Sequence, residues 1–298
     1  MTAAASQIKE NKRKKSGKHS VSNFFIYLIL SIWAVTTIYP FVWVILNSFR
    51  QKGLIRSDSF SVPVGRSFTF DNYKTAFDRV DIGGAYKNSL IISTVVTIAV
   101  VLLAGLAAYG LARYTFRGRR ALQTLVIASM MFPVFSTIIP VFRMMFAWHI
   151  AGTDSLALSQ LSVILPQIAG NLSFAIMVLM GFIRGLPVDL EEAAYLEGCS
   201  VFQIFFKVVI PVVKPAFATV AIFTFLWSYN DLLTQMFFLR YKETFTITRL
   251  LSEITSIAGV NYGLMAAAVV LVVVPVMIVY IALQKNIIKG LTVGAIKG

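Results

Sequence analysis

The segment EEAAYLEGCSVFQIFFKVVIPVVKP, residues 191–215, is a short polar element inside a very hydrophobic chain. Asp189 precedes it and can cap a helix whose third residue is Glu192, which is the spacing of a capping box. The carboxylates at this end lie where the helix dipole favours negative charge. Gly198 can adopt the left-handed conformation that ends a helix. The sequence therefore predicts a short, well-defined helix before Gly198.

A second short helix is predicted directly after the first. Ser200 and Gln203 repeat the capping-box spacing, and Pro211 marks the point where this helix meets the next apolar run. A plain connection between two membrane spans does not need two capped helices, whereas an element that docks and transmits force does. An amphipathic helix lying on lipid is the alternative, but its acidic first turn has the wrong sign for an anionic membrane surface.

The composition indicates an integral membrane protein. The chain has 298 residues, 57% of them hydrophobic, and a mean hydropathy of +0.77, which is more apolar surface than a soluble domain can hide. Its 27 Lys and Arg, against 13 Asp and Glu, cluster beside apolar runs, which indicates membrane orientation rather than nucleic-acid binding. The single cysteine, Cys199, excludes an internal disulfide, and the isolated His19 and His149 do not have metal-ligand spacing.

Six apolar runs are long enough to cross a membrane, whose hydrocarbon core needs about 20 helical residues. The fifth carries Lys214 near one end and Asp231 near the other, so we expect it to face protein or water rather than lipid. Prolines inside the runs, such as Pro133 and Pro140 in the third, can kink their helices. The predicted spans are 24–46, 88–112, 121–142, 158–183, 212–238 and 260–284.

Basic residues predict that both ends of the chain lie on one side of the membrane. The N-terminal tail, residues 1–23, the loop after the second span and the C-terminal tail, residues 285–298, all carry Lys or Arg. Short basic segments remain in the cytoplasm, so six spans over residues 24–284 leave both tails and the 184–215 element cytoplasmic. The first external loop, residues 47–87, has seven basic residues, but it also has four acidic ones, and longer loops weigh less in this rule.

The polar element also resembles a known motif. Glu192-Ala193-Ala194, three residues, Gly198, nine residues and then Val208-x-Ile210-Pro211 is similar to the EAA loop of ABC importer permeases, which reads E-A-A-x3-G-x9-I-x-L-P. The spacing matches throughout, and the differences at Val208 and Ile210 are conservative. Order, spacing and topological position all agree with this family.

The resemblance covers nearly the whole chain from the first span. KNSLIISTVVTIAVVLLAGLAAYGLARYTFRGRR resembles the second-span region of carbohydrate permeases, and LWSYNDLLTQMFFL resembles their W-x-x-N-D segment. YGLMAAAVVLVVVPVMIVYIALQKNIIKGLTVGAIKG resembles the end of the maltose-type permease, the smaller of two channel subunits. The resemblance implies an all-α membrane protein, a type I ABC importer permease with six transmembrane helices and a cytoplasmic coupling helix.

Partners follow from the same resemblance. It implies a heterodimer with a second homologous permease, two ATPase subunits, an external solute-binding protein and a place among the lipids of the bacterial plasma (inner) membrane. The sequence lacks a phosphate-cradling G-x-x-x-x-G-K-[ST] loop. We therefore expect a transporter subunit and not an enzyme, with no cofactor of its own and with ATP and Mg bound by the ATPase subunits.

The EAA resemblance assigns a set of residues to ATPase coupling. Glu192 can pair with basic groups of the ATPase, but an exposed ion pair contributes only about 0–1 kcal/mol. Packing of small and apolar side chains should therefore supply most of the grip. The tail at 290–298 is a further candidate for ATPase contact. The predicted coupling residues are Glu191, Glu192, Ala193, Ala194, Leu196, Gly198 and Pro211.

A solute path is predicted near one end of the fifth span. Sugars require flat apolar faces together with paired donors and acceptors. Hydrogen bonding between helices is an alternative role for each polar side chain. Arg143, after the third span, could instead attract an acidic saccharide or extend to the membrane interface. The candidate residues are Trp227, Tyr229, Asn230, Asp231, Gln167, Asn171 and Arg143, and no metal ligands are predicted.

The leading hypothesis is the channel subunit of an ATP-driven importer for an oligosaccharide, either neutral or acidic, delivered by an external binding protein. An ABC permease for another solute, such as a polyamine or phosphate, is the alternative, because the EAA loop alone does not name the cargo. An ion-coupled secondary transporter would need ionisable residues at mid-membrane, for which Asp231 is the one candidate. A membrane enzyme is disfavoured, because the sequence shows no nucleophile–base or metal-binding pattern.

Overall fold

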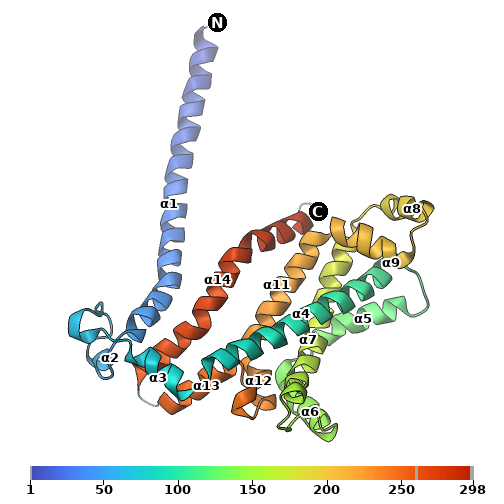
Figure 1. The fold of residues 1–298 in the computed structure, drawn as a ribbon. Coiled ribbons are helices and arrows are strands. Elements are labelled where there is room, and N and C mark those ends of the chain that lie inside the picture. Colours follow the sequence, from blue (N-terminus) through green and yellow to red (C-terminus); the bar gives the residue numbers. More distant parts are fainter. Residues whose placement is uncertain (1, 259–260, 296–298) are drawn as a thin grey trace. The chain divides into compact units, whose positions relative to one another are not determined.

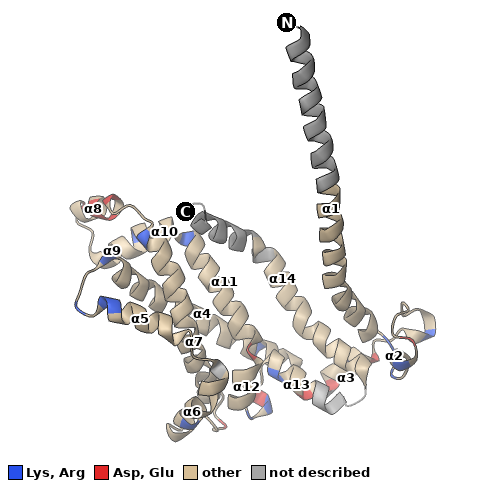
Figure 2. Cartoon of the chain, turned by 180° about the vertical axis from the view of Figure 1, so that it is seen from behind, with Lys and Arg blue, Asp and Glu red and all other residues tan. Residues whose placement is uncertain are grey.

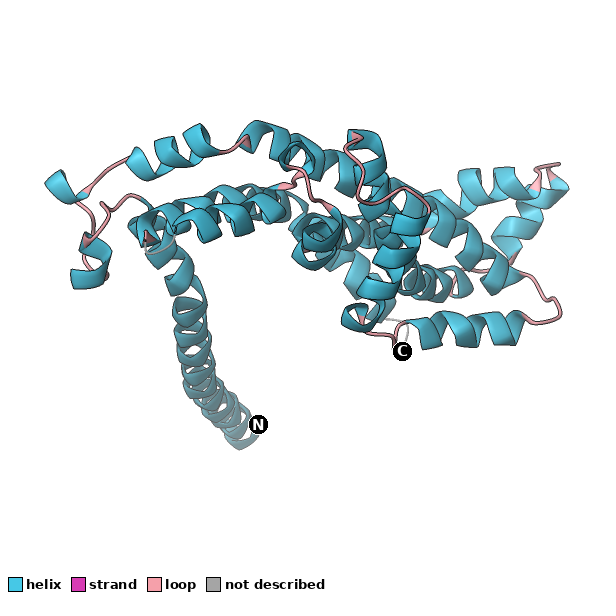
Figure 3. Cartoon of the chain, turned by 90° about the horizontal axis from the view of Figure 1, so that it is seen from below, coloured by secondary structure: helices cyan, strands magenta, loops and turns pink. Residues whose placement is uncertain are grey.

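The structure, a computed structural model, describes the backbone of residues 2–258 and 261–295 and the side chains of most residues in 23–254 and 261–281. Within these residues the chain folds into helices joined by loops (Figure 3). It divides into two compact units. The first contains residues 1–74 and 258–270, and the second contains residues 75–257 and 271–298. The all-helical fold predicted from the sequence is confirmed.

The elements differ widely in length, from single turns to helices of more than 30 residues (Figure 1). In chain order they are α1 (Thr2–Ser48), α2 (Leu54–Ser57), the 3₁₀ turn η1 (Gly65–Ser67), α3 (Asp71–Arg79), α4 (Ile82–Arg113), α5 (Arg119–Ser129), α6 (Val134–Ala147), α7 (Leu156–Arg184), α8 (Asp189–Leu196), α9 (Val201–Ile204), the π-helical turn η2 (Phe205–Val209), α10 (Ile210–Val212), α11 (Lys214–Asn230), α12 (Leu232–Phe238), the 3₁₀ turn η3 (Lys242–Thr244), α13 (Ile247–Ala258) and α14 (Tyr262–Ala295).

Four helical segments of the described chain are long and apolar enough to cross a membrane. They lie in α1, α4, α7 and α14, and they contain most of the first, second, fourth and sixth predicted spans. A fifth crossing is reached if α9–α10 and α11 count as one span, although they are bent by 83° at the break between them. Residue 260, where the sixth span was predicted to begin, lies outside the described residues, and α14 begins at Tyr262.

The third predicted span, 121–142, is wrong as a single helix. The structure divides it into α5, which ends at Ser129, and α6, which begins at Val134. Pro133 lies in the break with extended backbone, φ −71° and ψ 135°. Proline lacks a backbone donor and disfavours helical backbone in the residue before it, which explains why the apolar run breaks here rather than kinking.

The fifth predicted span, 212–238, is also divided. The helix α11 ends at Asn230, and the carboxylate of Asp231 accepts a hydrogen bond from the backbone N–H of Thr234, 3.0 Å away. Asp231 therefore caps the separate helix α12. The charge noted near the end of this span is the residue that ends it, because an aspartate satisfies the free N–H groups of a helix start.

The core of the second unit is formed by α4, α7 and α11, which pack against one another. On α4, Ala104 and Ala108 are completely buried. A side-chain carbon added at Gly105 would lie 2.8 Å from the ring of Phe217 on α11. These small residues permit the close helix approach predicted from the sequence.

The first unit is held together by polar contacts around the end of α1. Asn72 donates to the backbone carbonyls of Ser48 and Arg50, each at 2.9 Å. Arg50 is 2% exposed, and its guanidinium donates to the Ser61 hydroxyl at 2.9 Å. Gly263 lies against Asn72 and the Arg50 carbonyl, where no side chain would fit. Arg50 is therefore a structural residue within this unit rather than a free surface charge.

Many charged residues of the second unit lie near the ends of its helices (Figure 2). Lys and Arg concentrate around the α4–α5 connection, whereas Asp and Glu mark α8. Of the predicted tails, residues 1–23 and 285–298, the backbone over 2–23 belongs to α1 and that over 285–295 to α14. The side chains of 1–22 and 285–298 lie outside the described residues, so the roles predicted for these tails are not tested.

Candidate functional site

The short helix α8 begins differently from the sequence prediction. The first helical hydrogen bonds run from Glu191 and Glu192 back to the carbonyl of Val188, at 2.8 and 3.1 Å. Val188 is already helical, with φ −66° and ψ −30°, and no side chain caps this end. The predicted Asp189–Glu192 capping box is therefore wrong, because the helix starts one residue earlier and Asp189 falls within its first turn.

The end of α8 and the start of the next helix follow the prediction. Gly198 has φ +83°, and its N–H donates to the carbonyl of Tyr195 at 2.9 Å. Ser200 and Gln203 form the predicted capping box, in which the Ser200 N–H donates to Gln203 Oε1 at 2.8 Å and Ser200 Oγ accepts from the Gln203 N–H at 3.4 Å. Left-handed backbone suits glycine, so both short helices have fixed boundaries.

The connection to the next span contains two irregularities. The π-helical turn η2 follows α9, and the chain bends by 83° between Val201–Val212 and Lys214–Asn230. Pro211 lies in α10, two residues before the break at Val213. The sequence predicted that Pro211 marks this junction, and the bend is found there. π-Helical turns such as η2 are rare, and they are often found at functional sites.

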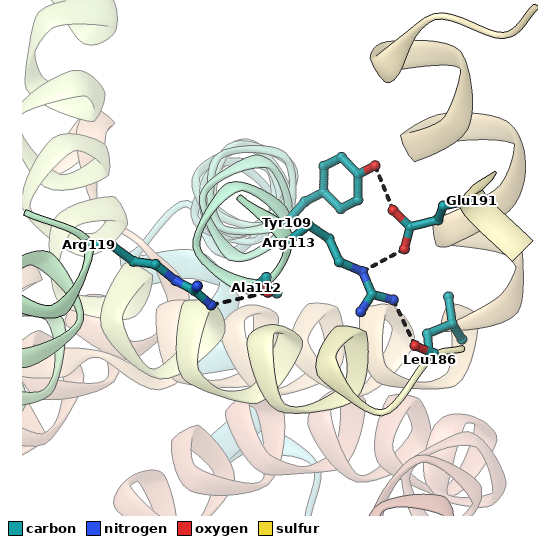
Figure 4. Close-up of polar contacts among 6 residues, drawn as sticks. All are labelled: Tyr109, Ala112, Arg113, Arg119, Leu186 and Glu191. Atoms are coloured by element: carbon teal, nitrogen blue, oxygen red, sulfur yellow. Dashed lines mark hydrogen bonds and ion pairs between the residues drawn. The ribbon is translucent and has the colours of Figure 1, made fainter. Parts of the chain in front are cut away.

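Glu191 is held inside the chain (Figure 4). The Tyr109 hydroxyl donates to Glu191 Oε2 at 2.9 Å, and Arg113 Nε donates to Glu191 Oε1 at 2.6 Å. Arg113 also donates through Nη2 to the Leu186 carbonyl at 2.9 Å. Only 8% of Glu191 is exposed. Removing one partner of a buried ion pair costs about 3–5 kcal/mol, so this contact fixes the start of α8 firmly.

The opposite side of α8 is free in the chain. Leu196 is 86% exposed, and Asp189, Glu192 and Ala193 are also exposed. Tyr195, which is 69% exposed, lies one turn after Glu191 on the same side of the helix. Ala194 is half-buried. The helix therefore has a held face, which carries Glu191, and an open face that combines Ala193 and Leu196 with the carboxylates of Asp189 and Glu192.

Sequence reasoning missed the partners of Glu191. Arg113 was assigned to membrane orientation alone, and Tyr109 was not singled out. A usable signal was present, because Tyr109 and Arg113 are four residues apart and therefore share one face at the end of an apolar helix. An arginine on the same predicted side of the membrane as an acidic loop is a natural partner for it.

A second site is an open cavity of about 610 Å³ in the second unit. Four of the seven predicted path residues line it, from α7 and from the α11–α12 junction. Among its described lining residues, Asp231 carries the one ionisable side chain, and the remainder are apolar or uncharged polar groups. The predicted residues that line the cavity are Gln167, Asn171, Trp227 and Asp231.

Hydrogen bonds hold the polar wall of this cavity. Gln167 Nε2 donates to Asp231 Oδ2 at 2.8 Å, and the Ser228 hydroxyl donates to Gln167 Oε1 at 2.6 Å. Gln235, which is 1% exposed, donates to the Ser228 carbonyl at 3.1 Å. Trp227 is 46% exposed and packs edge-on against Phe174, with ring centroids 4.8 Å apart. The wall thus offers an aromatic ring beside oriented donors and acceptors, although part of its polar capacity already joins helices.

The other three predicted path residues lie elsewhere. Tyr229 is 4% exposed and packs against Phe225 within the protein. Asn230 lines a different hollow, formed by α11 and α14, and donates to the Leu226 carbonyl at 2.8 Å. Arg143 is exposed on α6 and does not line the cavity. The structure therefore does not place these three with the Gln167–Asp231 wall.

Comparison with known proteins identifies the family. Residues 100–293 match the binding-protein-dependent transport system inner membrane component family. The chain belongs to this family. Its members are membrane components of transport systems, so the protein is a multi-pass transporter subunit rather than an enzyme, as predicted. In the described residues, no group of three or more His, Cys, Asp and Glu could hold a metal ion.

Curated relatives match almost the whole chain. The diacetylchitobiose uptake system permease protein NgcG of Streptomyces coelicolor is 33% identical over 91% of this chain and 88% of its own length. The arabinooligosaccharides transport system permease protein AraQ of Bacillus subtilis is 31% identical over 96% of this chain and 99% of its own length. Both are permeases of carbohydrate systems, which confirms the predicted resemblance.

A solved structure supports the fold. The chain resembles a bacterial ABC transporter involved in the import of the acidic polysaccharide alginate, with a TM-score of 0.73 and 21% identity over 89% of this chain and 96% of that chain. At this identity the likeness extends to the fold alone. The predicted architecture, that of an ABC importer permease, is confirmed.

Proposed function

We propose that this chain is the channel subunit of an ATP-driven importer that moves an uncharged oligosaccharide into the cytoplasm. The observation that carries the cargo assignment is the cavity that combines the Trp227 ring with the Gln167–Asp231 wall. Aromatic faces and fixed hydrogen-bonding groups are what sugar rings require. The names of relatives such as NgcG and AraQ, which are permeases for carbohydrate systems, support the same cargo class.

The charge of the cavity favours neutral cargo over acidic cargo. Its described lining residues include the carboxylate of Asp231 and no Lys or Arg. A uronate oligomer or phosphate would meet a like charge in a partly desolvated site, which is unfavourable. Arg143, the residue expected to attract an acidic sugar, lies outside this lining. The alginate importer that shares this fold therefore does not determine the cargo of this chain.

The remaining partners belong to the same proposal. The open face of α8, with Leu196 and Ala193 exposed, offers one docking site for an ATPase, so two ATPase subunits require a second permease. ATP and Mg are bound by those ATPase subunits, and an external solute-binding protein delivers the cargo. The termini, the α4–α5 connection and α8 face the cytoplasm, in keeping with the basic residues around the α4–α5 connection.

A secondary transporter is the rival of a different class. Its ionisable relay would need a free group at mid-membrane. Asp231 does not suit that role, because its two oxygens already accept hydrogen bonds from the Thr234 N–H and from Gln167. An ion relay through Asp231 would have to disrupt the hydrogen bond with which this carboxylate caps α12.

The proposal is tested with the complete complex in lipid vesicles, supplied with its binding protein and a panel of neutral and uronic oligosaccharides. We expect ATP-dependent uptake of a neutral oligosaccharide. Trp227→Ala should lower uptake at subsaturating cargo. Asn230→Ala is the matched control and should leave uptake unchanged, because Asn230 is next to Asp231 in the sequence but lines the other hollow, formed by α11 and α14. Uptake confined to uronic oligosaccharides or to a non-sugar solute would overturn the cargo assignment.

A further inference from the structure

We propose that Glu191 is a positioning residue that fixes α8 to the ends of α4 and α7, rather than a contact for the ATPase. This inference rests on the proposed function, because it assigns to Glu191, Tyr109 and Arg113 the task of holding the ATPase-docking helix in place. It also changes the role predicted from the sequence, in which Glu191 and Glu192 both faced the ATPase.

The geometry separates the two neighbouring glutamates. Both oxygens of the Glu191 carboxylate are engaged, one by the Tyr109 hydroxyl at 2.9 Å and the other by Arg113 Nε at 2.6 Å. Glu191 is 8% exposed, whereas Glu192 is exposed. A buried carboxylate whose two oxygens both accept charge-assisted hydrogen bonds within its own chain is not available to bind a partner protein. Glu192 is free to meet one.

The helix α8 needs such an anchor. It has eight residues and no side chain caps its start, and isolated helices of this length are not stable in water. Arg113 connects three segments of the chain. It is the last residue of α4, it pairs with Glu191 in the first turn of α8, and it donates to the Leu186 carbonyl in the α7–α8 connection. The guanidinium fork suits such a divided contact.

The anchor also links α8 to the cavity wall. The Tyr109 ring packs against Phe205, with centroids 5.3 Å apart, and Phe205 packs against Phe217 of α11 at 6.4 Å. Gly105, one turn before Tyr109, leaves room for Phe217. These ring contacts connect the α8 anchor to α11, which carries Trp227. Loss of the anchor should weaken ATPase docking without removing any residue from the docking face.

The test measures the affinity of the purified ATPase dimer for the permease pair in lipid nanodiscs. Glu191→Gln and Arg113→Gln should each weaken docking about tenfold, which corresponds to about 1.4 kcal/mol. The effect of the double variant should be smaller than the sum of the two single effects, because each single variant already removes the Glu191–Arg113 contact. Glu192→Gln is the matched control, and its effect should add to that of Arg113→Gln because it acts on a different face.

Two further variants protect the test against a loss of folding. Tyr109→Phe removes one hydroxyl and should weaken docking by about threefold, as expected for a single hydrogen bond. Arg113→Lys keeps the charge and should recover part of the loss. A photoreactive residue at Leu196 should still capture the ATPase in wild type, and at lower yield in Arg113→Gln.

Additive effects of Glu191→Gln and Arg113→Gln, or wild-type docking by Arg113→Gln and Tyr109→Phe, would overturn the positioning role and leave Glu191 as a direct ATPase contact. Failure of the wild-type permease pair to bind any ATPase would instead refute the proposed function, so the two failures are distinguishable.

Discussion

The end of α8 depends on a left-handed backbone at Gly198, and this dependence can be measured. Gly198 has φ +83°, and a side-chain carbon added there would meet no atom within 4 Å. The cost of Gly198→Ala is therefore one of backbone conformation and not of crowding. For a residue with a side chain, the left-handed conformation costs about 1–2 kcal/mol.

That cost should appear as opening of α8. A change of one to two kcal/mol alters a two-state ratio by a factor of roughly 5 to 30. We therefore expect amide hydrogen exchange of α8, followed by mass spectrometry of the purified complex, to accelerate by that factor in Gly198→Ala. Gly198→Asn should have a smaller effect, because asparagine tolerates left-handed backbone, and a β-branched Gly198→Val should have a larger one.

Gly181→Ala is the matched control for this prediction. Gly181 lies inside α7 with ordinary helical backbone, and an added side-chain carbon would also meet no atom within 4 Å. Alanine there should stabilise the helix by about 0.5–1 kcal/mol and leave α8 exchange unchanged. Wild-type exchange of α8 in Gly198→Ala, or equal acceleration in Gly181→Ala, would refute the role assigned to Gly198.

Three further predictions concern packing, polar contacts and charge. Gly105→Ala should destabilise the detergent-solubilised protein by about 1–3 kcal/mol through crowding against Phe217, and Phe217→Leu should cost less in that background than in wild type; additive melting shifts would contradict this. Gln235→Leu should remove the buried hydrogen bonds that Gln235 makes to the Ser228 carbonyl and to the hydroxyls of Thr246 and Thr248 and cost about 1–3 kcal/mol in thermal unfolding, whereas the exposed Met236→Leu should be neutral. Arg143→Gln should affect uptake of neutral and acidic saccharides equally, and a selective loss of acidic cargo would show that Arg143 does reach the solute.

Local rules predicted the local features of the coupling element correctly. Gly198 and the Ser200–Gln203 pair depend on backbone geometry and on hydrogen bonds within four residues, so the sequence contains all the necessary information. The predicted Asp189 cap was wrong for an equally local reason. Val188 is already helical, so the helix starts one residue earlier than predicted. Helix boundaries that depend on one residue's dihedral angles are not fixed by composition or spacing.

Tertiary contacts were the part that sequence could not supply. The burial of Glu191 depends on Tyr109 and Arg113, which are about 80 positions away in the chain. The cavity wall likewise depends on Gln167 meeting Asp231 across two helices. The apolar pattern predicted that Gln167 lies on a helix, but it did not predict which neighbouring helix Gln167 would face. From the sequence, Asp231 was an unexplained charge near the end of a predicted span, whereas in the structure it caps α12.

The most direct test of the central claim is the energy source of uptake. Vesicles containing the complete complex, with its binding protein and a labelled neutral oligosaccharide outside, are loaded with either ATP and Mg or a non-hydrolysable ATP analogue, each with and without an ion gradient. We predict uptake in vesicles that contain hydrolysable ATP, with or without the gradient. Uptake driven by the ion gradient in the absence of ATP hydrolysis would contradict the assignment of this chain as the channel subunit of an ATP-driven importer.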